Sequence, residues 1–161
     1  MFRNLTIFAI LLALFVVVLG AYVRLSDAGL GCPDWPGCYG SLIVDESHEG
    51  VAHAAEHYPE RPLEVSKAWK EMIHRYFASG LGLVILILTI MAWRRPELGQ
   101  RGLTTLLLLL VMFQGALGMW TVTLLVKPAI VMSHLLGGLA TLSLLLLLLL
   151  RIQTKRLAQT D

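Results

Sequence analysis

The sequence predicts an all-α integral membrane protein, a four-transmembrane-helix bundle with a long extracytoplasmic loop between its first and second helices. Hydrophobic residues make up 57% of the 161 residues and charged residues only 15%, whereas soluble domains average about 25% charged residues. Four apolar segments are long enough to cross a hydrocarbon core, which takes about 20 helical residues. Basic residues gather on one side of these segments. We expect a single membrane domain over residues 1–161.

The four apolar segments are expected to be helices, because strands with open edges would leave backbone groups unpaired in lipid. Their expected bounds are residues 5–23, 74–93, 103–125 and 129–150. The first segment could be a cleaved signal peptide, since Arg3 precedes it. It is longer than a usual signal core and lacks a clear small-residue cleavage site, so we interpret it as the first span.

The orientation follows from the basic residues near the spans. Most of them lie between the second and third segments and after the fourth: Arg94, Arg95, Arg101, Arg151, Lys155 and Arg156. The turn between the third and fourth segments holds only Lys127. The positive-inside rule then predicts that both termini are cytoplasmic and that the loop over residues 24–70 is outside. We expect a multi-pass protein of a bacterial inner membrane, surrounded by lipid. This topology explains the net charge of +2, so no nucleic-acid partner is predicted.

A stretch rich in glycine and proline, GLGCPDWPGCYG at residues 29–40, holds the two cysteines of the chain, Cys32 and Cys38. Thiols that face an oxidising compartment are readily held as a disulfide, and the short spacing makes this pairing geometrically plausible. Such a bond could be a structural staple. It could also be redox-active, because strained and exposed disulfides are the labile ones.

Polar residues inside spanning helices are costly, so each of them is a candidate for function. Three such residues are His74, Gln114 and His134. The two histidines are expected in the outer half of the bilayer at comparable depth. Opposed imidazoles from facing helices are a known way for a helix bundle to ligate haem iron. We therefore predict His74 and His134 as axial ligands of a haem.

Small residues follow both histidines on the same helix faces. Ala78 and Gly82 share a face with His74, and Gly137 and Gly138 lie one turn beyond His134. These small residues could simply allow close packing of helices. They could also leave room for a flat cofactor.

Two charged residues flank His74. Glu71 shares its helix face and is a candidate catalytic residue that gives or takes protons. It could equally be an ordinary acid near a helix N-terminus, where the helix dipole favours negative charge. Arg75 could bind a haem propionate, or its side chain could extend to the lipid headgroups.

The outer loop also contains HAAEH, His53 to His57, which fits the H-x-x-E-H pattern of inverzincin metallopeptidases. A catalytic zinc site needs a third protein ligand and a built cleft, and the loop offers neither. We interpret this stretch as solvated surface.

Four stretches of the chain, in order, resemble the signature stretches of the haem A synthase family. They are GAYVRLSDAGLGCPDWPGCYG (residues 20–40), EMIHRYFASGLGL (71–83), FQGALGMWTVTLLVKP (113–128) and SHLLGGLATL (133–142). The resemblance implies an oxidoreductase that oxidises the C8 methyl of haem O to a formyl group, giving haem A for cytochrome oxidase assembly. It implies that Glu71 and His74 belong to the haem O site, that His134 is the second histidine, and that Cys32 and Cys38 are the outer cysteine pair.

Members of this family usually carry eight spanning helices in two similar halves, one for the substrate haem and one for a haem b. This chain resembles the N-terminal half. It could be part of a longer product or a compact form that dimerises. The expected partners are therefore a second four-helix half or a second copy, and the farnesyltransferase that produces haem O.

Two other functions share features of this sequence. A non-catalytic cytochrome of the b type with two axial histidines would use His74 and His134 but needs neither Glu71 nor the cysteines. A thiol oxidoreductase of the DsbB or vitamin K epoxide reductase kind also has four helices and outer cysteines. Those enzymes use two communicating cysteine pairs, whereas this chain has one pair with a C-x5-C spacing.

Overall fold

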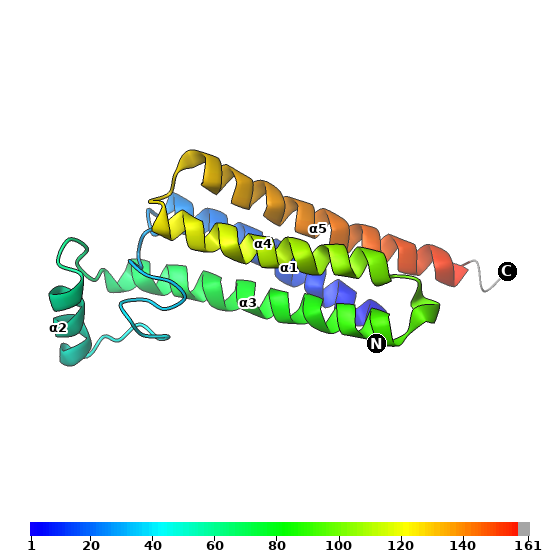
Figure 1. Ribbon diagram of the computed structural model, residues 1–161, viewed down its shortest axis with the longest axis horizontal. Coiled ribbons are helices and arrows are strands. Elements are labelled where there is room, and N and C mark those ends of the chain that lie inside the picture. Colours follow the sequence, from blue (N-terminus) through cyan, green and yellow to red (C-terminus); the bar gives the residue numbers. More distant parts are fainter. Residues whose placement is uncertain (158–161) are drawn as a thin grey trace.

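The computed structural model describes residues 1–157 and the side chains of residues 1–155. Four long helices form a bundle, with a short helix and an irregular loop at one end (Figure 1). The long helices are α1 (Phe2–Leu25), α3 (Val65–Arg94), α4 (Arg101–Thr123) and α5 (Pro128–Leu157), and the short one is α2 (His48–His57). A 3-10 turn, η1 (Pro96–Leu98), joins α3 to α4. All four long helices are long and apolar enough to cross a membrane. The predicted fold class is confirmed.

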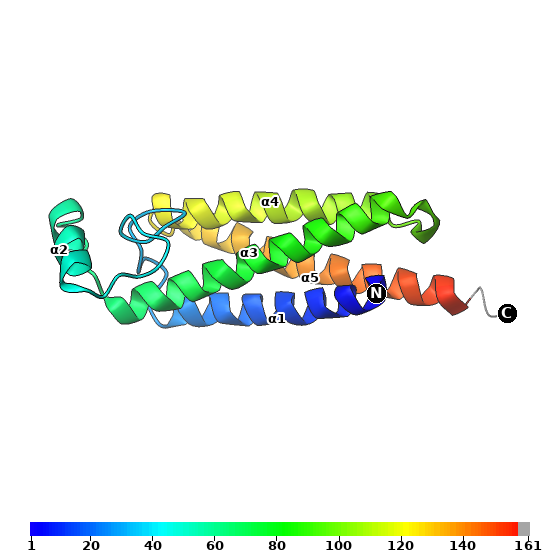
Figure 2. The same cartoon turned by 90° about the horizontal axis from the view of Figure 1, so that it is seen from below.

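Each long helix packs mainly against two neighbours. α1 contacts α3 and α5, and α4 contacts the same two helices. α3 and α5 therefore lie on one diagonal of the bundle, and α1 and α4 on the other. The loop and α2 lie beyond one end of the bundle, whereas the start of α1 lies toward the other end (Figure 2). We call these the loop end and the terminal end.

The second spanning helix starts earlier than hydropathy predicts. The expected start was His74, whereas α3 begins at Val65 and ends at Arg94. Hydropathy detects only the apolar part of a helix, and backbone hydrogen bonds continue beyond it. Glu71 consequently lies within the regular helix, and its side chain is held in a fixed direction relative to His74.

The α2 helix was not predicted, because the acidic and histidine-bearing part of the loop was interpreted only as solvated surface. A local signal for it exists. The hydroxyl of Ser47 accepts a hydrogen bond of 3.1 Å from the backbone N–H of Gly50, as an N-cap does. The following residues include three alanines and two glutamates, which are good helix formers.

Two apolar clusters lie at opposite ends of the molecule. The larger cluster fills the terminal end with side chains from all four long helices: Phe2, Ala9, Ala13, Leu81, Ile85, Leu88, Ala92, Leu103, Leu107, Leu145 and Leu148. The smaller one fixes the loop to the start of α3: Cys32, Cys38, Tyr39, Val44, Ala54, Ala68 and Met72. His74 and His134 lie between the two clusters, in what we call the histidine layer.

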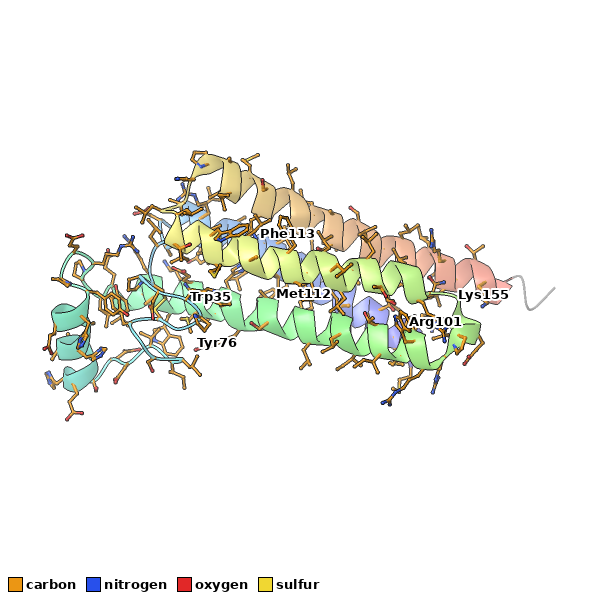
Figure 3. The ribbon with its side chains drawn as sticks, in the orientation of Figure 1. Trp35, Tyr76, Arg101, Met112, Phe113 and Lys155 are labelled. Carbon is orange, nitrogen blue, oxygen red and sulfur yellow. A yellow bond between two sulfur atoms is a disulfide. The ribbon has the colours of Figure 1, made fainter. Side chains whose placement is uncertain are left out.

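The outer faces of the bundle are apolar, and the basic side chains of the α3–α4 connection and of the end of α5 are at its terminal end. Large exposed apolar residues such as Leu109 and Met112 occur on the long helices. Figure 3 shows Arg101 and Lys155 near the terminal end, and Trp35 and Tyr76 near the loop end. An apolar surface of this extent is what a lipid environment requires. The protein is a multi-pass membrane protein.

Candidate functional site

The two predicted histidines come from the diagonal helices α3 and α5. Each ring lies against a glycine of a neighbouring helix. A Cβ atom added to Gly20 of α1 would lie 2.9 Å from Cε1 of His74, and one added to Gly118 of α4 would lie 3.5 Å from Cε1 of His134. The two imidazoles are thus placed in related ways on the two diagonal helices.

Both histidines carry a ring nitrogen that is buried and has no hydrogen-bond partner. The atoms are Nδ1 of His74 and Nδ1 of His134. Threonines elsewhere in the bundle behave differently, since the hydroxyl of Thr6 donates to the carbonyl of Phe2 and that of Thr141 donates to the carbonyl of Gly137. A buried polar atom without a partner costs free energy, so the histidines are not explained by the stability of the bundle alone.

These donors fit a haem. Haem iron accepts imidazole ligands from the helices of a bundle, and the chain offers one imidazole from each of two diagonal helices. A Cβ atom added to Gly82 would meet no other atom within 4 Å, so this glycine is not needed for close helix packing. Among the residues described, no three His, Cys, Asp or Glu side chains could hold a bare metal ion together.

Glu71 is buried, and both of its carboxylate oxygens have a partner. Its Oε2 accepts a hydrogen bond of 3.0 Å from the backbone N–H of Cys32, and its Oε1 lies 2.5 Å from Nη2 of Arg75. The carboxylate is directed to the cysteine loop, where it joins α3 to Cys32, 39 positions earlier in the chain.

Arg75 binds the same loop through backbone carbonyls. Its guanidinium donates to the backbone carbonyls of Gly37 at 2.5 Å, Asp34 at 3.1 Å and Pro36 at 3.3 Å. Neither a propionate contact nor a lipid headgroup is needed to explain this side chain. Arg75 and Glu71 together fix the cysteine loop over the first turns of α3. Sequence reasoning missed this role, because it depends on backbone carbonyls that carry no residue signature.

The loop also has its own internal bonds. The carboxylate of Asp34 accepts the backbone N–H groups of Tyr39 at 2.7 Å and Gly40 at 2.9 Å. The hydroxyl of Tyr39 donates to the carbonyl of Pro62 at 3.2 Å. Burial raises the pKa of Tyr39 above its usual value, so this hydroxyl keeps its proton. The loop is a defined structure that can hold Glu71 in place.

Cys32 and Cys38 form a disulfide, which confirms the predicted pair. Both residues are buried, with relative exposures of 0% and 1%. The chain has no other cysteine. This chain therefore holds one cysteine pair, whereas the thiol oxidoreductases considered above use two.

The HAAEH stretch forms the end of α2. The rings of His53 and His57 stack with centroids 4.1 Å apart, and both residues are exposed. His53 also borders a cavity of about 300 Å³ beside Cys38. The interpretation as surface agrees with this exposure.

Gln114, the third polar residue of the spans, faces the bundle interior one turn from Gly118. Sequence reasoning did not find Gly20 and Gly118 as neighbours of the histidines. The only signal for them was the presence of glycine inside apolar helices, and such glycines occur in membrane helices for several reasons.

Comparisons with known proteins identify the family of the chain. The sequence model of the COX15-CtaA family, described as "Cytochrome oxidase assembly protein", matches residues 3–161. The chain is 51% identical to a protein named "Heme A synthase" from Shewanella oneidensis over 148 residues, covering 92% of this chain and 44% of that protein. It is 30% identical to a "Heme A synthase" from Halalkalibacterium halodurans, covering 93% and 46%. A third protein of that name, from Caulobacter vibrioides, is 32% identical, covering 77% and 35%. The chain spans less than half the length of these relatives.

Proposed function

The chain belongs to the COX15-CtaA family, and on this premise we propose that it is the substrate-side four-helix unit of a haem A synthase. The proposed reaction oxidises the C8 methyl of haem O to a formyl group and gives haem A for cytochrome oxidase assembly. The observation that carries the proposal is the pair of buried imidazoles, His74 and His134, whose Nδ1 atoms have no partner.

In this proposal His74 and His134 would hold the haem iron. A bound haem supplies a metal centre at which oxidation of an unactivated methyl becomes possible. The protein orients the substrate and excludes water. The larger cluster, which includes Leu81 and Leu145, lies on the terminal side of the histidine layer, and the cysteine loop lies on the other side.

Glu71 is the proposed catalytic residue of the unit. Its carboxylate lies one turn from His74 and is held by Cys32 and Arg75. A carboxylate fixed in this way can hold or pass a proton near the histidine layer. Arg75 keeps its direction constant, and the disulfide keeps the loop closed around both side chains.

The orientation is also part of the proposal. The basic side chains Arg94, Arg95 and Arg101 are exposed at the terminal end, and the positive-inside rule assigns that end to the cytoplasm. The cysteine loop, α2 and the histidine layer would then be on the outer side of a bacterial inner membrane.

A second four-helix unit is proposed as the partner that completes the activity. It would come from the same gene product or from a second copy of this chain, and it would hold a haem b. Transfer of haem O from the farnesyltransferase that makes it is the expected supply. Light scattering of the purified protein distinguishes one copy from two.

Expression of the chain with a haem O source, followed by chromatography of the extracted haems, tests the function. Wild type should yield haem A or its alcohol precursor when the second unit is present. Glu71→Gln should retain haem O without oxidising it, and His74→Ala should lose the haem. The matched controls are Glu56→Gln and His53→Ala, which change exposed residues of α2 and should leave the product unchanged.

The outcomes separate the alternatives. Normal product from both Glu71→Gln and His74→Ala would contradict the proposed site. A protein that binds haem b through two histidines but never contains an oxidised haem, even with the second unit present, would be a simple cytochrome. The Glu71, Arg75 and Cys32 contacts favour the synthase, because electron transfer alone has no need of them.

A further inference from the structure

We propose that Gln114 is a specificity-determining residue, whose buried side-chain amide binds the hydroxyl group of a hydroxyalkylated haem and so selects haem O over haem b. This inference rests on the proposed function. It assigns a role to Gln114, the one of the three polar residues singled out from the sequence that the site described above does not use.

Gln114 is deeply buried and incompletely bonded. Its relative exposure is 8%, and its Nε2 atom is buried without a hydrogen-bond partner. An unpaired amide in a membrane interior is costly. Gln100 is the other glutamine with an unpartnered buried atom, Oε1, but it lies at the terminal end of α4, far along the helix from the histidine layer.

The position of Gln114 relates it to His134. Gly118, which lies against His134, is one helical turn above Gln114, a rise of about 5.4–6 Å. On the facing helix, a Cβ atom added to Gly137 would overlap the Gln114 amide. Gly137 follows His134 by three residues and therefore shares its face. Gln114 thus faces the same interior as His134, on the side toward the larger apolar cluster.

The chemistry of the amide indicates which haem substituent it would bind. A propionate is anionic, and a neutral amide in the membrane interior would leave that charge unpaired at high cost. A neutral hydroxyl is a suitable partner, because an amide can both donate to it and accept from it. Haem O carries such a hydroxyl on the carbon that joins its farnesyl chain to the ring. Haem b has a vinyl group in that position.

The experiment uses the chain in lipid nanodiscs, prepared without haem and titrated separately with haem O and haem b. Absorption spectra give the affinity for each haem. The farnesyl chain adds apolar contacts of its own, so the informative quantity is the ratio of the two affinities in each variant. Gln114→Leu should lower the haem O to haem b ratio about fivefold to tenfold, as expected for one lost neutral hydrogen bond. Gln100→Leu, the matched control, should leave the ratio unchanged.

Thermal unfolding gives a second readout that a packing role would not produce. Without haem, Gln114→Leu should raise the midpoint of unfolding, because an unpaired buried amide is removed. With haem O bound, the same substitution should lower the midpoint relative to wild type. A purely structural glutamine would give the same sign in both states. Gln114→Met repeats the test with an unbranched side chain.

An unchanged ratio in Gln114→Leu, or an equal loss of affinity for both haems, would overturn the proposal. So would failure of both the Leu and Met variants to fold without haem, since the amide would then be required by the fold. A wild type that binds neither haem would refute the proposed function together with this inference. Normal selectivity with no oxidised product in the complete assembly would refute the proposed function alone.

Discussion

The His74 side and the His134 side of the bundle place their imidazoles in related ways but differ in what surrounds them. Each ring lies against a glycine, Gly20 or Gly118, and each has an unpartnered Nδ1. The His74 side adds a buried ion pair and a disulfide-closed loop over α3. On the His134 side, residues 124–127 form a short turn that leads directly into α5. In the proposed site, the similarity is what two ligands of one metal would require, and the difference would place the proton chemistry on the α3 side.

The largest expected effect tests the similarity. His74→Ala and His134→Ala should each weaken haem binding by more than about 100-fold, because loss of a ligand should exceed the usual cost of losing an outer partner. The measurement is titration of the haem-free protein with haem b, followed by absorption. If one of these substitutions had no effect, the two histidines would not share one metal.

The next effect tests the difference. Glu71→Ala should lower the free energy of unfolding by about 3–5 kcal/mol, because it leaves the buried Arg75 without its partner. The side chains of Arg75 and Glu71 are only 13% and 7% exposed, so water screens them little. Thermal unfolding in detergent measures the change. Glu64→Ala breaks the exposed Glu64–Lys67 pair and should cost less than about 1 kcal/mol. Equal effects of the two substitutions would show that the Glu71 pair is solvated.

A matched pair of glycine substitutions compares the helix surfaces against which the two imidazole rings lie. Gly20→Ala places a methyl group 2.9 Å from His74, so the ring must move, at an expected cost of about 1–3 kcal/mol. Gly118→Ala gives ordinary contact at 3.5 Å from His134 and should be neutral, or stabilising by up to about 1 kcal/mol through helix propensity. Thermal unfolding and the spectrum of bound haem report both. The reverse order of effects would contradict the described geometry.

The smallest effect lies in the loop. Ser47→Ala removes the N-cap of α2 and should cost that helix about 1 kcal/mol, seen as faster amide exchange in residues 48–57.

Hydrogen bonds from Ser47 lower the pKa of the exposed Asp45. This contribution is present above the usual pKa of aspartate, about 3.9, and is lost as the pH falls through the lowered value. The protection of α2, measured as its exchange relative to the unstructured rate at each pH, should therefore fall at acidic pH, whereas haem affinity at neutral pH should be unchanged in Ser47→Ala. A loss of haem affinity would mean that α2 supports the histidine layer.

Much of the fold could be predicted because hydropathy is a local property. The apolar runs located all four spans. The bounds were less accurate at the polar ends, since α3 continues to Val65 and α5 to Leu157. The α2 helix was not predicted, although Ser47 and the alanines after it indicate a helix start. Turn-like residues elsewhere in the loop obscured that pattern.

The candidate site was predictable only as a set of residues. His74, His134, Glu71 and the cysteines were identified as polar or reactive groups in or near apolar helices. The contacts that these residues make with one another and with the loop were not predictable. Arg75 was expected at a propionate or in the headgroups, and the structure gives it three carbonyls of the cysteine loop.

By itself, the sequence determined that the chain spans a membrane four times, that it offers two histidines in comparable positions, and that its two cysteines are close enough to bond. These properties depend on spacing and composition along the chain. Only the tertiary structure decided that Glu71 accepts from Cys32, that Arg75 closes the loop, and that Gly20 and Gly118 lie against the histidines. Those contacts join residues distant in the chain, so they exist only when the helices pack and the loop folds back onto α3.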